Sequence, residues 1–197
     1  QKNLARSALS IVEEFRTIRR LGIKEVEIYD DTFTWSRKRL HEICRGLIEA
    51  DLGIEWAVRD RVNSAAIDTE SLKMMREAGC VRIHYGIESG VQAVIDRMKK
   101  RITLDQAQSA VSLAKQADIT VLTYFMFGNL DETVDDMRKT IDFALSLNAD
   151  FAQFSITIPY AGTEMYDEAL KEGQIEFDYW RDYALNPVKD FLPPKLI

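Results

Sequence analysis

The chain has 197 residues and a net charge of −6, with 46% hydrophobic and 29% charged residues. This composition is ordinary for a globular domain with one sizeable core, and it argues against nucleic acid as the main partner. No run approaches the ~18 apolar residues of a membrane span. Two cysteines exclude a disulfide framework, so we expect a reducing cytoplasm. Because the first residue is Gln1, we expect a piece of a longer protein.

Five apolar runs typical of β-strands follow one another at regular intervals, beginning near Glu25, Ile54, Cys80, Ile119 and Asp150. Each run ends in a polar or glycine-bearing loop. Helical patterns fill the intervals, at residues 7–21, 36–50, 64–78, 91–98, from 103 onward, at 133–147 and at 163–172. This repeat predicts an α/β array with a parallel sheet and outer helices, whose ligands bind at the carboxyl ends of the strands. Since a helix comes first, the array lacks its first strand.

One side of the predicted strands is polar. In the third strand, Ile83 and Tyr85 alternate with Arg82 and His84. If the apolar side faces the helices, the polar side lines an interior, and a packed eight-stranded barrel has no room for it. The pattern predicts an open or incomplete barrel around a large polar ligand. A closed barrel with mutually paired polar groups is the alternative.

We expect several of these polar residues to converge on one cavity, open at the strand carboxyl ends. They are Glu25 or Glu27, Arg59, His84, Glu88 and Ser155. His84 has a second interpretation, as an interior histidine with satisfied hydrogen bonds. Cys44 and Cys80 are predicted to be structural, since free cysteine behaves as a small hydrophobe. His41 is predicted at the surface.

Two domain segments are predicted. Residues 1–173 form the array, and residues 174–197 form an aromatic, proline-bearing tail without a clear period, which we interpret as a covering segment.

The second strand is predicted to end at Val58, with Arg59, Asp60 and Arg61 in the following loop.

Four strand ends carry recognisable motifs: DDTF at 30–33, GIES at 86–89, FMFGNLDE at 125–132 and IPYAGT at 158–163. In this order they resemble the radical S-adenosylmethionine superfamily, within it the class that carries a cobalamin-binding domain upstream. The resemblance implies a partial, TIM-like (β/α)6 barrel, and five strands plus the missing one make six. It covers about residues 7–172.

The resemblance also implies an enzyme with S-adenosylmethionine, a [4Fe–4S] cluster and a cobalamin as cofactors. In such an enzyme the reduced cluster generates a 5′-deoxyadenosyl radical, for methyl transfer or a related reaction, with flavodoxin or ferredoxin as electron donor. The cluster is bound by a C-x-x-x-C-x-x-C motif after the first strand. This chain has no such motif, so we expect no metal ligands in it and no activity of the fragment alone.

The resemblance assigns cofactor contacts to individual positions. Asp30, Asp31 and Thr32 belong to the motif that meets the methionyl ammonium group, where carboxylates suit its three N–H donors. Glu88 and Ser89 stand at the strand end near the ribose. The alternatives are a solvated turn that also caps the following helix for the aspartates, and for Glu88 a structural salt bridge to Arg59 or Arg82.

The remaining contacts come from four other segments. Lys100 stands near the methionyl carboxylate, with a solvated surface lysine as the alternative. The other positions assigned to the cofactor are Arg59, Gly128, Glu132, Pro159, Tyr160 and Gly162. At Leu130 the sequence departs from the family, which usually has proline there. No catalytic residue is assigned.

Two other functions stay open from the sequence. A (β/α)-barrel aldolase or phosphate-binding enzyme would need a Schiff-base lysine on a strand or a late glycine-rich loop, and neither is evident. A degenerate barrel could serve as a non-catalytic binding module. Three closely spaced cysteines upstream of Gln1 would decide for the radical enzyme.

Overall fold

The computed structural model describes residues 5–30, 32–63 and 67–193. The strands are β1 (Glu25–Ile28), β2 (Glu55–Asp60), β3 (Cys80–Glu88), β4 (Thr120–Phe127) and β5 (Phe151–Ile156). The helices are α1 (Ala8–Arg20), α2 (Arg37–Ala50), α3 (Thr69–Glu77), α4 (Gln92–Arg97), α5 (Leu104–Gln116), α6 (Val134–Ser146), α7 (Glu164–Lys171) and α8 (Tyr179–Leu185). Each strand from β1 to β5 is followed by a helix, and β3 by two, α4 and α5, as the repeat predicts.

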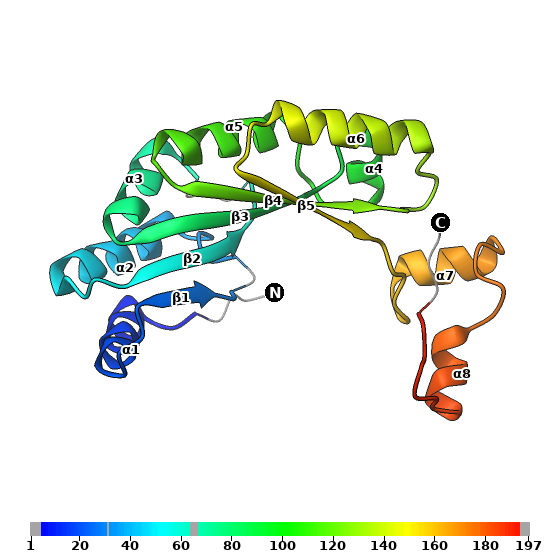
Figure 1. Cartoon of the computed structure of the whole chain (residues 1–197), viewed down its shortest axis with the longest axis horizontal. Helices are drawn as coiled ribbons and strands as arrows, with labels where there is room; N and C mark the ends of the chain where they lie inside the picture. Colours follow the sequence, from blue (N-terminus) through cyan, green and yellow to red (C-terminus); the bar gives the residue numbers. More distant parts are fainter. Residues whose placement is uncertain (1–4, 31, 64–66, 194–197) are drawn as a thin grey trace.

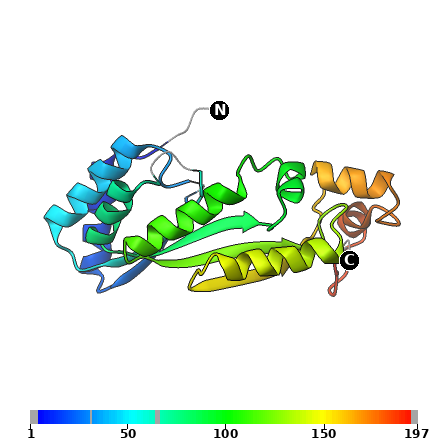
Figure 2. The ribbon, with the colours of Figure 1, turned by 90° about the horizontal axis from the view of Figure 1, so that it is seen from above.

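In the described part of the chain, the strands form one parallel sheet in the order β1-β2-β3-β4-β5. The sheet is curved, and α2, α3, α5 and α6 cover its convex face while the concave face carries no helix (Figure 1). Seen from above, these helices lie along the strands (Figure 2). β1 and β5 lie at opposite edges of the sheet, so the barrel is open. The predicted α/β partial barrel is confirmed.

The core lies between the sheet and these helices, because the apolar sides of β1 to β4 face them, whereas every residue of β5 is exposed. In β3, Ile83, Tyr85 and Ile87 are fully buried in the same cluster as α3 and α5 side chains. Arg82 and His84 lie on the opposite, concave face, where they contact β1 and β4. The predicted division into an apolar outer side and a polar inner side is therefore confirmed for β2 and β3, whereas β5 is exposed on both sides.

Side-chain caps fix where the helices begin, and this orients the loops before them. The Thr103 hydroxyl accepts a hydrogen bond from the Gln106 N–H, and the Gln106 side-chain oxygen accepts one from the Thr103 N–H. These two bonds form a reciprocal capping box. Ser36 caps α2 in the simpler way, by accepting from the Arg39 N–H.

Two expectations about local structure are wrong. β2 extends to Asp60, because Arg59 and Asp60 still pair with His84 and Tyr85 of β3. His41 is buried, and its Nε2 lies 2.8 Å from the Ser71 hydroxyl of α3, which gives this polar side chain a partner within the α2–α3 contact.

The segment predicted to cover the array contains the helix α8. The Trp180 indole N–H donates to the Pro159 carbonyl oxygen at 2.9 Å, and the Tyr166 hydroxyl of α7 donates to Asp178 at 2.7 Å. These bonds join the tail to the last loop of the array. The division at residue 173 stays a prediction.

Candidate functional site

Several predicted cofactor residues lie at one edge of the sheet. Because all strands run parallel, their carboxyl ends share that edge. Asp30 follows β1, Glu88 ends β3, Gly128 follows β4 and Pro159 follows β5. Asp31 lies outside the described residues.

Glu88 and Lys100 form an ion pair at this edge. Glu88 has a positive φ of 78°, and the pairing of β3 with β4 shifts between Gly86 and Glu88. This irregularity turns the Glu88 carboxylate back over Gly86, on the concave face. A Cβ at Gly86 would lie 2.7 Å from Glu88 Oε1 and 3.1 Å from Lys100 Nζ. The structure thus pairs two predicted cofactor residues with each other and places neither next to Arg59 or Arg82.

The loop after β4 is held by Glu132. One carboxylate oxygen, Oε2, accepts from the Gly128 N–H at 2.7 Å and from the Asn129 N–H at 3.0 Å. The other oxygen, Oε1, is buried without a hydrogen-bond partner among the described residues. Gly128 has φ +78°, which a side chain would disfavour. Asn129 also accepts from the Thr157 hydroxyl at 3.0 Å, so this loop is tied to the end of β5.

Ser89 is placed differently from its neighbour Glu88. Its hydroxyl is fully buried against α6, 3.1 Å from the Thr140 hydroxyl. The Gly90 N–H donates to the same Thr140 oxygen at 3.0 Å. The side-chain contacts of Ser89 therefore join the strand end to α6, and its predicted contact with the ribose stays untested.

The loop after β1, which contains Asp30 and Thr32, is anchored by a residue that the sequence analysis assigned no role. Asp60 of β2 is buried, and its Oδ2 accepts from the Thr34 N–H at 3.0 Å. Burial raises the pKa of Asp60 to about 6, although hydrogen bonds from the Arg61 N–H and from the Thr34 hydroxyl and N–H act against this rise. A charged residue on the apolar side of β2 is the sequence signal that could have identified it.

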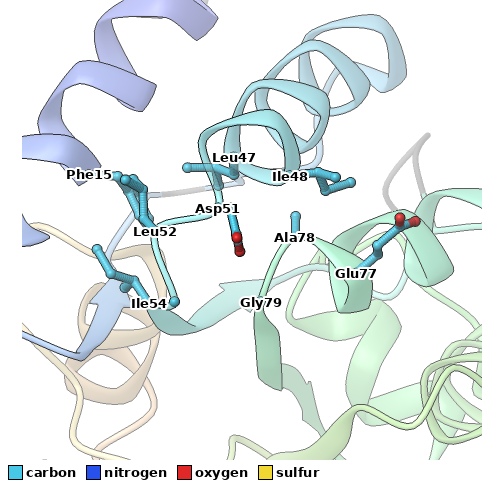
Figure 3. Close-up of a pocket in the computed structure, with 10 residues that line it drawn as sticks. Phe15, Leu47, Ile48, Asp51, Leu52, Ile54, Glu77, Ala78 and Gly79 are labelled. Atoms are coloured by element: carbon cyan, nitrogen blue, oxygen red, sulfur yellow. The ribbon is translucent and has the colours of Figure 1, made fainter.

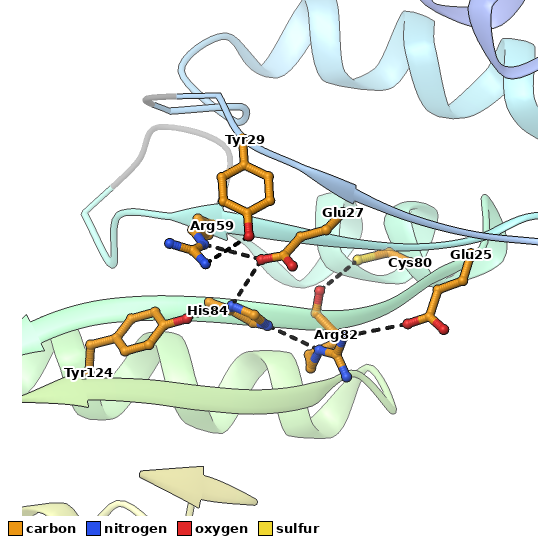
Figure 4. A network of polar contacts seen from close by, with 8 residues as sticks. All are labelled: Glu25, Glu27, Tyr29, Arg59, Cys80, Arg82, His84 and Tyr124. Atoms are coloured by element: carbon orange, nitrogen blue, oxygen red, sulfur yellow. Dashed lines mark hydrogen bonds and ion pairs between the residues drawn. The ribbon is translucent and has the colours of Figure 1, made fainter. Parts of the chain in front are cut away.

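Charged side chains of β1 and β2 meet on the concave face below this edge (Figure 4). Arg59 donates to Glu27 Oε1 at 3.1 Å and to the Tyr29 hydroxyl at 3.1 Å. Its guanidinium also lies over the Tyr29 ring, 4.4 Å from the centroid. Although burial acts against it, the Arg59 hydrogen bond leaves the pKa of Glu27 below its ordinary value. Glu27 therefore stays ionised at neutral pH.

The same network continues through β3 to β4. Arg82 Nε donates to His84 Nε2 at 3.0 Å, and His84 Nδ1 lies 3.0 Å from the Tyr124 hydroxyl. Burial lowers the pKa of His84, against the opposing charge of Glu27. Since a guanidinium only donates, Nε2 accepts, and the proton of the neutral ring is on Nδ1. His84 is thus an interior histidine with satisfied hydrogen bonds.

The predicted convergence of inner residues is found for part of the set. Glu27, Arg59 and His84 are joined in one network, and Arg82 links it to Glu25 with an N–O distance of 3.5 Å. Glu88 lies on the same face two residues beyond Gly86. Ser155 is exposed on β5, paired in register with Met126, and no contact joins it to the network within the described ranges. The face is open rather than a closed cavity.

The last loop faces the tail. The Tyr160 ring lies 5.3 Å from that of Trp180, and more than half of its surface is exposed. Gly162 has φ +79°, which allows the turn into α7. No contact of Pro159, Tyr160 or Gly162 with Glu88 or Lys100 is present in the described part of the chain.

The two cysteines lie in the core and away from this edge. Burial raises the pKa of Cys44 to about 12 and raises that of Cys80 as well, so both thiols stay protonated. Among residues 5–30, 32–63 and 67–193, no three His, Cys, Asp or Glu side chains are grouped to hold a metal ion.

We therefore expect this chain alone to bind no iron after anaerobic reconstitution, because an iron–sulfur cluster needs several thiolates in one place. Iron and sulfide analysis, with the visible absorption spectrum, measures this. Stoichiometric iron and sulfide on the purified chain would contradict it.

A pocket of about 200 Å³ lies at the opposite end of the strands, between α2 and the starts of β2 and β3 (Figure 3). Apolar side chains such as Phe15, Leu47 and Ile54 line it together with the carboxylate residues Asp51 and Glu77. None of the predicted cofactor residues lines it. Separately, the described helices include none with the length and apolar character needed to cross a membrane.

The comparisons with known proteins agree on one family. The model of the family "Radical SAM superfamily" matches residues 2–144. An uncharacterized methyltransferase of Pyrococcus horikoshii is 36% identical over 180 residues, which is 90% of this chain and 39% of that protein. An anaerobic magnesium-protoporphyrin IX monomethyl ester cyclase of Rubrivivax gelatinosus is 28% identical, over 81% of this chain and 28% of its own length. The chain thus spans well under half of these relatives.

Solved structures show the same fold. The radical S-adenosylmethionine methyltransferase TsrM from Kitasatospora setae, with tryptophan and an S-adenosylmethionine analogue bound, has a TM-score of 0.75. The match covers 85% of this chain and 33% of that one, at 19% identity. The family model matches most of the length of this chain, and the fold is a parallel partial barrel. The chain therefore belongs to the radical S-adenosylmethionine superfamily.

Proposed function

We propose that this chain is the S-adenosylmethionine-binding part of a cobalamin-dependent radical enzyme that transfers a methyl group. The observation that carries the proposal is the set of polar groups at one edge of the sheet. Asp30, the Glu88–Lys100 pair and the Gly128 loop stand at the carboxyl ends of β1, β3 and β4 of the same parallel sheet. The methyltransferase relative and the fold of TsrM support the reaction class.

The residues of this edge fit S-adenosylmethionine. Gly86 leaves the space that the Glu88 carboxylate and the Lys100 ammonium group occupy, and a Cβ there would collide with both. The Lys100 ammonium group suits a carboxylate of the ligand, and the Glu88 carboxylate suits hydroxyl donors. Asp30, with Asp31 and Thr32 of the same motif, would take the ammonium end. Glu88 would accept from the ribose hydroxyls and Lys100 would meet the methionyl carboxylate.

The other predicted contacts complete the proposed site. Gly128 lets the backbone approach the nucleoside, and Glu132 fixes that loop with the hydrogen bonds described above. Pro159, Tyr160 and Gly162 would stand near the adenine edge. Arg59 lies lower on the concave face, in its network with Glu27. S-adenosylmethionine, when bound, supplies the radical chemistry and the methyl group, and these residues bind and orient it.

The described residues do not fit a [4Fe–4S] cluster. Cys44 and Cys80 are buried protonated thiols on the helix-covered side of the sheet, and cluster ligands are thiolates. In this proposal the cluster and the cobalamin are bound by other segments of the full-length protein. A reducing cytoplasm and a small electron donor such as flavodoxin or ferredoxin are parts of the same proposal, because a cluster of this kind must be reduced.

Changing Glu88 to alanine in the full-length enzyme is expected to weaken S-adenosylmethionine binding about ten-fold or more. The reason is the loss of charge-assisted hydrogen bonds, each worth roughly 1.5–3 kcal/mol. Calorimetric titration of S-adenosylmethionine into the anaerobically reconstituted enzyme measures the affinity. The cluster content is expected to stay unchanged. Asp31→Ala is expected to act in the same direction.

Glu164→Ala is the matched control for this experiment. Glu164 also pairs with a lysine, Lys99, at 2.5 Å, but both side chains are about two-thirds exposed on the outer surface. Removing the Glu164–Lys99 ion pair is expected to leave the S-adenosylmethionine affinity within about two-fold of the parent value, because exposed ion pairs contribute little. If Glu88→Ala binds as tightly as the parent, or only its melting temperature falls, the assignment of Glu88 is wrong.

A further inference from the structure

Asp60 is a buried carboxylate that none of the proposed cofactor contacts uses. It ends β2 on the helix-covered face of the sheet, with only 6% of its surface exposed. Its Oδ2 accepts from the Thr34 N–H at 3.0 Å, and its Oδ1 accepts from the Arg61 N–H at 2.8 Å. One carboxylate therefore joins the loop after β1 to the chain that leaves β2.

The loop after β1 is fixed at its far end by Asp60 and by packing. Phe33 is buried, and its ring meets the edge of Trp56 at a centroid distance of 5.6 Å. Thr34 is fully buried, and Ser36 then caps α2. Asp30 lies only four residues before Thr34. Because so short a segment has few conformations once one end is fixed, the Thr34 anchor restricts where Asp30 can lie.

The groups around Asp60 carry little compensating charge. Arg61 follows it in the chain, and Tyr85 and Cys80 face it from β3. The Tyr85 hydroxyl is buried and has no hydrogen-bond partner in the part of the chain that the structure describes. The Thr34 N–H and hydroxyl and the Arg61 N–H are bonded partners of this carboxylate, and the bonds are strongest when it is ionised.

We propose that Asp60 is a positioning residue for S-adenosylmethionine: its ionised carboxylate holds Thr34 and, through it, the segment that presents Asp30 to the methionyl ammonium group. This inference rests on the proposed function of the strand-end site. Asp60 itself does not touch the ligand. Protonation weakens its bond to the Thr34 N–H and loosens the segment, so ligand affinity depends on the charge of a buried group outside the site.

Affinity and stability are expected to respond to pH in opposite directions. Burial raises the pKa of Asp60 from 3.8 to about 6 in the folded chain, so folding favours the protonated form. The stability that this adds is complete below about pH 3.8 and is lost as the pH rises through about 6. The affinity for S-adenosylmethionine instead falls as the pH falls through about 6. A purely structural role would move both quantities together.

The test compares the parent full-length enzyme with Asp60→Asn. Calorimetric titrations with S-adenosylmethionine are made at about pH 7.5 and about pH 5.5, on either side of the expected transition. The affinity of the parent is expected to be about five-fold weaker at the lower pH. This factor corresponds to the difference in strength between a charge-assisted and a neutral hydrogen bond from the Thr34 N–H to Asp60. Asp60→Asn accepts through one oxygen only, so its affinity is expected to be about five-fold weaker at the higher pH and nearly independent of pH.

Asp68→Asn is the matched control. Asp68 also accepts from a backbone N–H, that of Ser71 at 2.8 Å, but at the start of α3 and outside the proposed site. Its substitution is expected to change stability and to leave the affinity and its pH dependence unchanged. If the parent binds no S-adenosylmethionine, the proposed function fails. If the parent binds but Asp60→Asn keeps the same affinity and pH slope, only the positioning role fails.

A second measurement applies if Asp60→Asn does not fold. Hydrogen exchange of the Thr34 amide is followed in the parent enzyme and corrected for the intrinsic dependence of exchange on pH. Protection is expected to decrease several-fold between about pH 7.5 and about pH 5.5, because the acceptor loses its charge. Constant protection across that range would overturn the inference.

Discussion

Replacing Gly90 by alanine is expected to lower the free energy of unfolding by about 3 kcal/mol, at the upper end for overpacked sites. A Cβ at Gly90 would lie 2.6 Å from Phe143 Cβ, 2.7 Å from Thr140 Cα and 2.9 Å from the Lys139 carbonyl oxygen. Two of these atoms belong to the α6 backbone, which cannot relieve the contact by a change of rotamer as a side chain can. The substitution must therefore separate α6 from the end of β3.

Urea denaturation of the purified chain, followed by circular dichroism, measures this loss. Thr140→Ser serves as a milder change at the same contact, since it keeps the hydroxyl that bonds Ser89 and the Gly90 N–H. We expect it to cost much less than Gly90→Ala. An alanine variant within about 0.5 kcal/mol of the parent, the range of neutral surface changes, would show that α6 does not approach Gly90 this closely.

The sheet was predictable from local pattern because each strand repeats the same physical requirement. In β3, the apolar Ile83 and Tyr85 alternate with the polar Arg82 and His84. This period of two identified the buried and the polar face of the strand. The regular interval between strands then gave the parallel array, since each crossover needs a helix. These features depend on residues close in sequence, which is why they needed no knowledge of the fold.

The partners of individual polar groups were less predictable. Glu88 pairs with Lys100, twelve residues later, because the chain after β3 passes through α4 and returns to the strand end. Asp60 was predicted in a loop, since a charged residue ends an apolar run, and the pairing with Tyr85 keeps it in the sheet. Neither contact follows from spacing. Each depends on how two distant segments approach each other.

The tail shows a third limit of local pattern. Its helix α8 is short and contains no buried residue, so no apolar stripe marked it in the sequence. The contacts that hold it are long-range, such as the Trp180 indole N–H on the Pro159 carbonyl oxygen. A helix stabilised mainly by tertiary contacts leaves little local signal.

Gly86 lies four residues before Gly90, and its substitution is expected to have the opposite outcome. A Cβ there would meet Glu88 Oε1 at 2.7 Å and Lys100 Nζ at 3.1 Å, which are the ends of flexible side chains. Gly86→Ala should therefore displace this ion pair without moving the backbone. We expect S-adenosylmethionine binding by the full-length enzyme to weaken about ten-fold, since both displaced groups are proposed ligand contacts.

Two measurements on the same variant separate this expectation from a fold defect. Calorimetric titration gives the affinity, and urea denaturation of the chain gives the free energy of unfolding. We expect the free energy of unfolding to stay within about 1 kcal/mol of the parent, because displacing one partly exposed ion pair costs little. Lys100→Ala in the Gly86→Ala background should add little further loss, since the alanine has already displaced Lys100. If Gly86→Ala instead unfolds the chain as Gly90→Ala does, the concave face at this strand end is closed by backbone, and the Glu88–Lys100 pair cannot be the open wall of a ligand site.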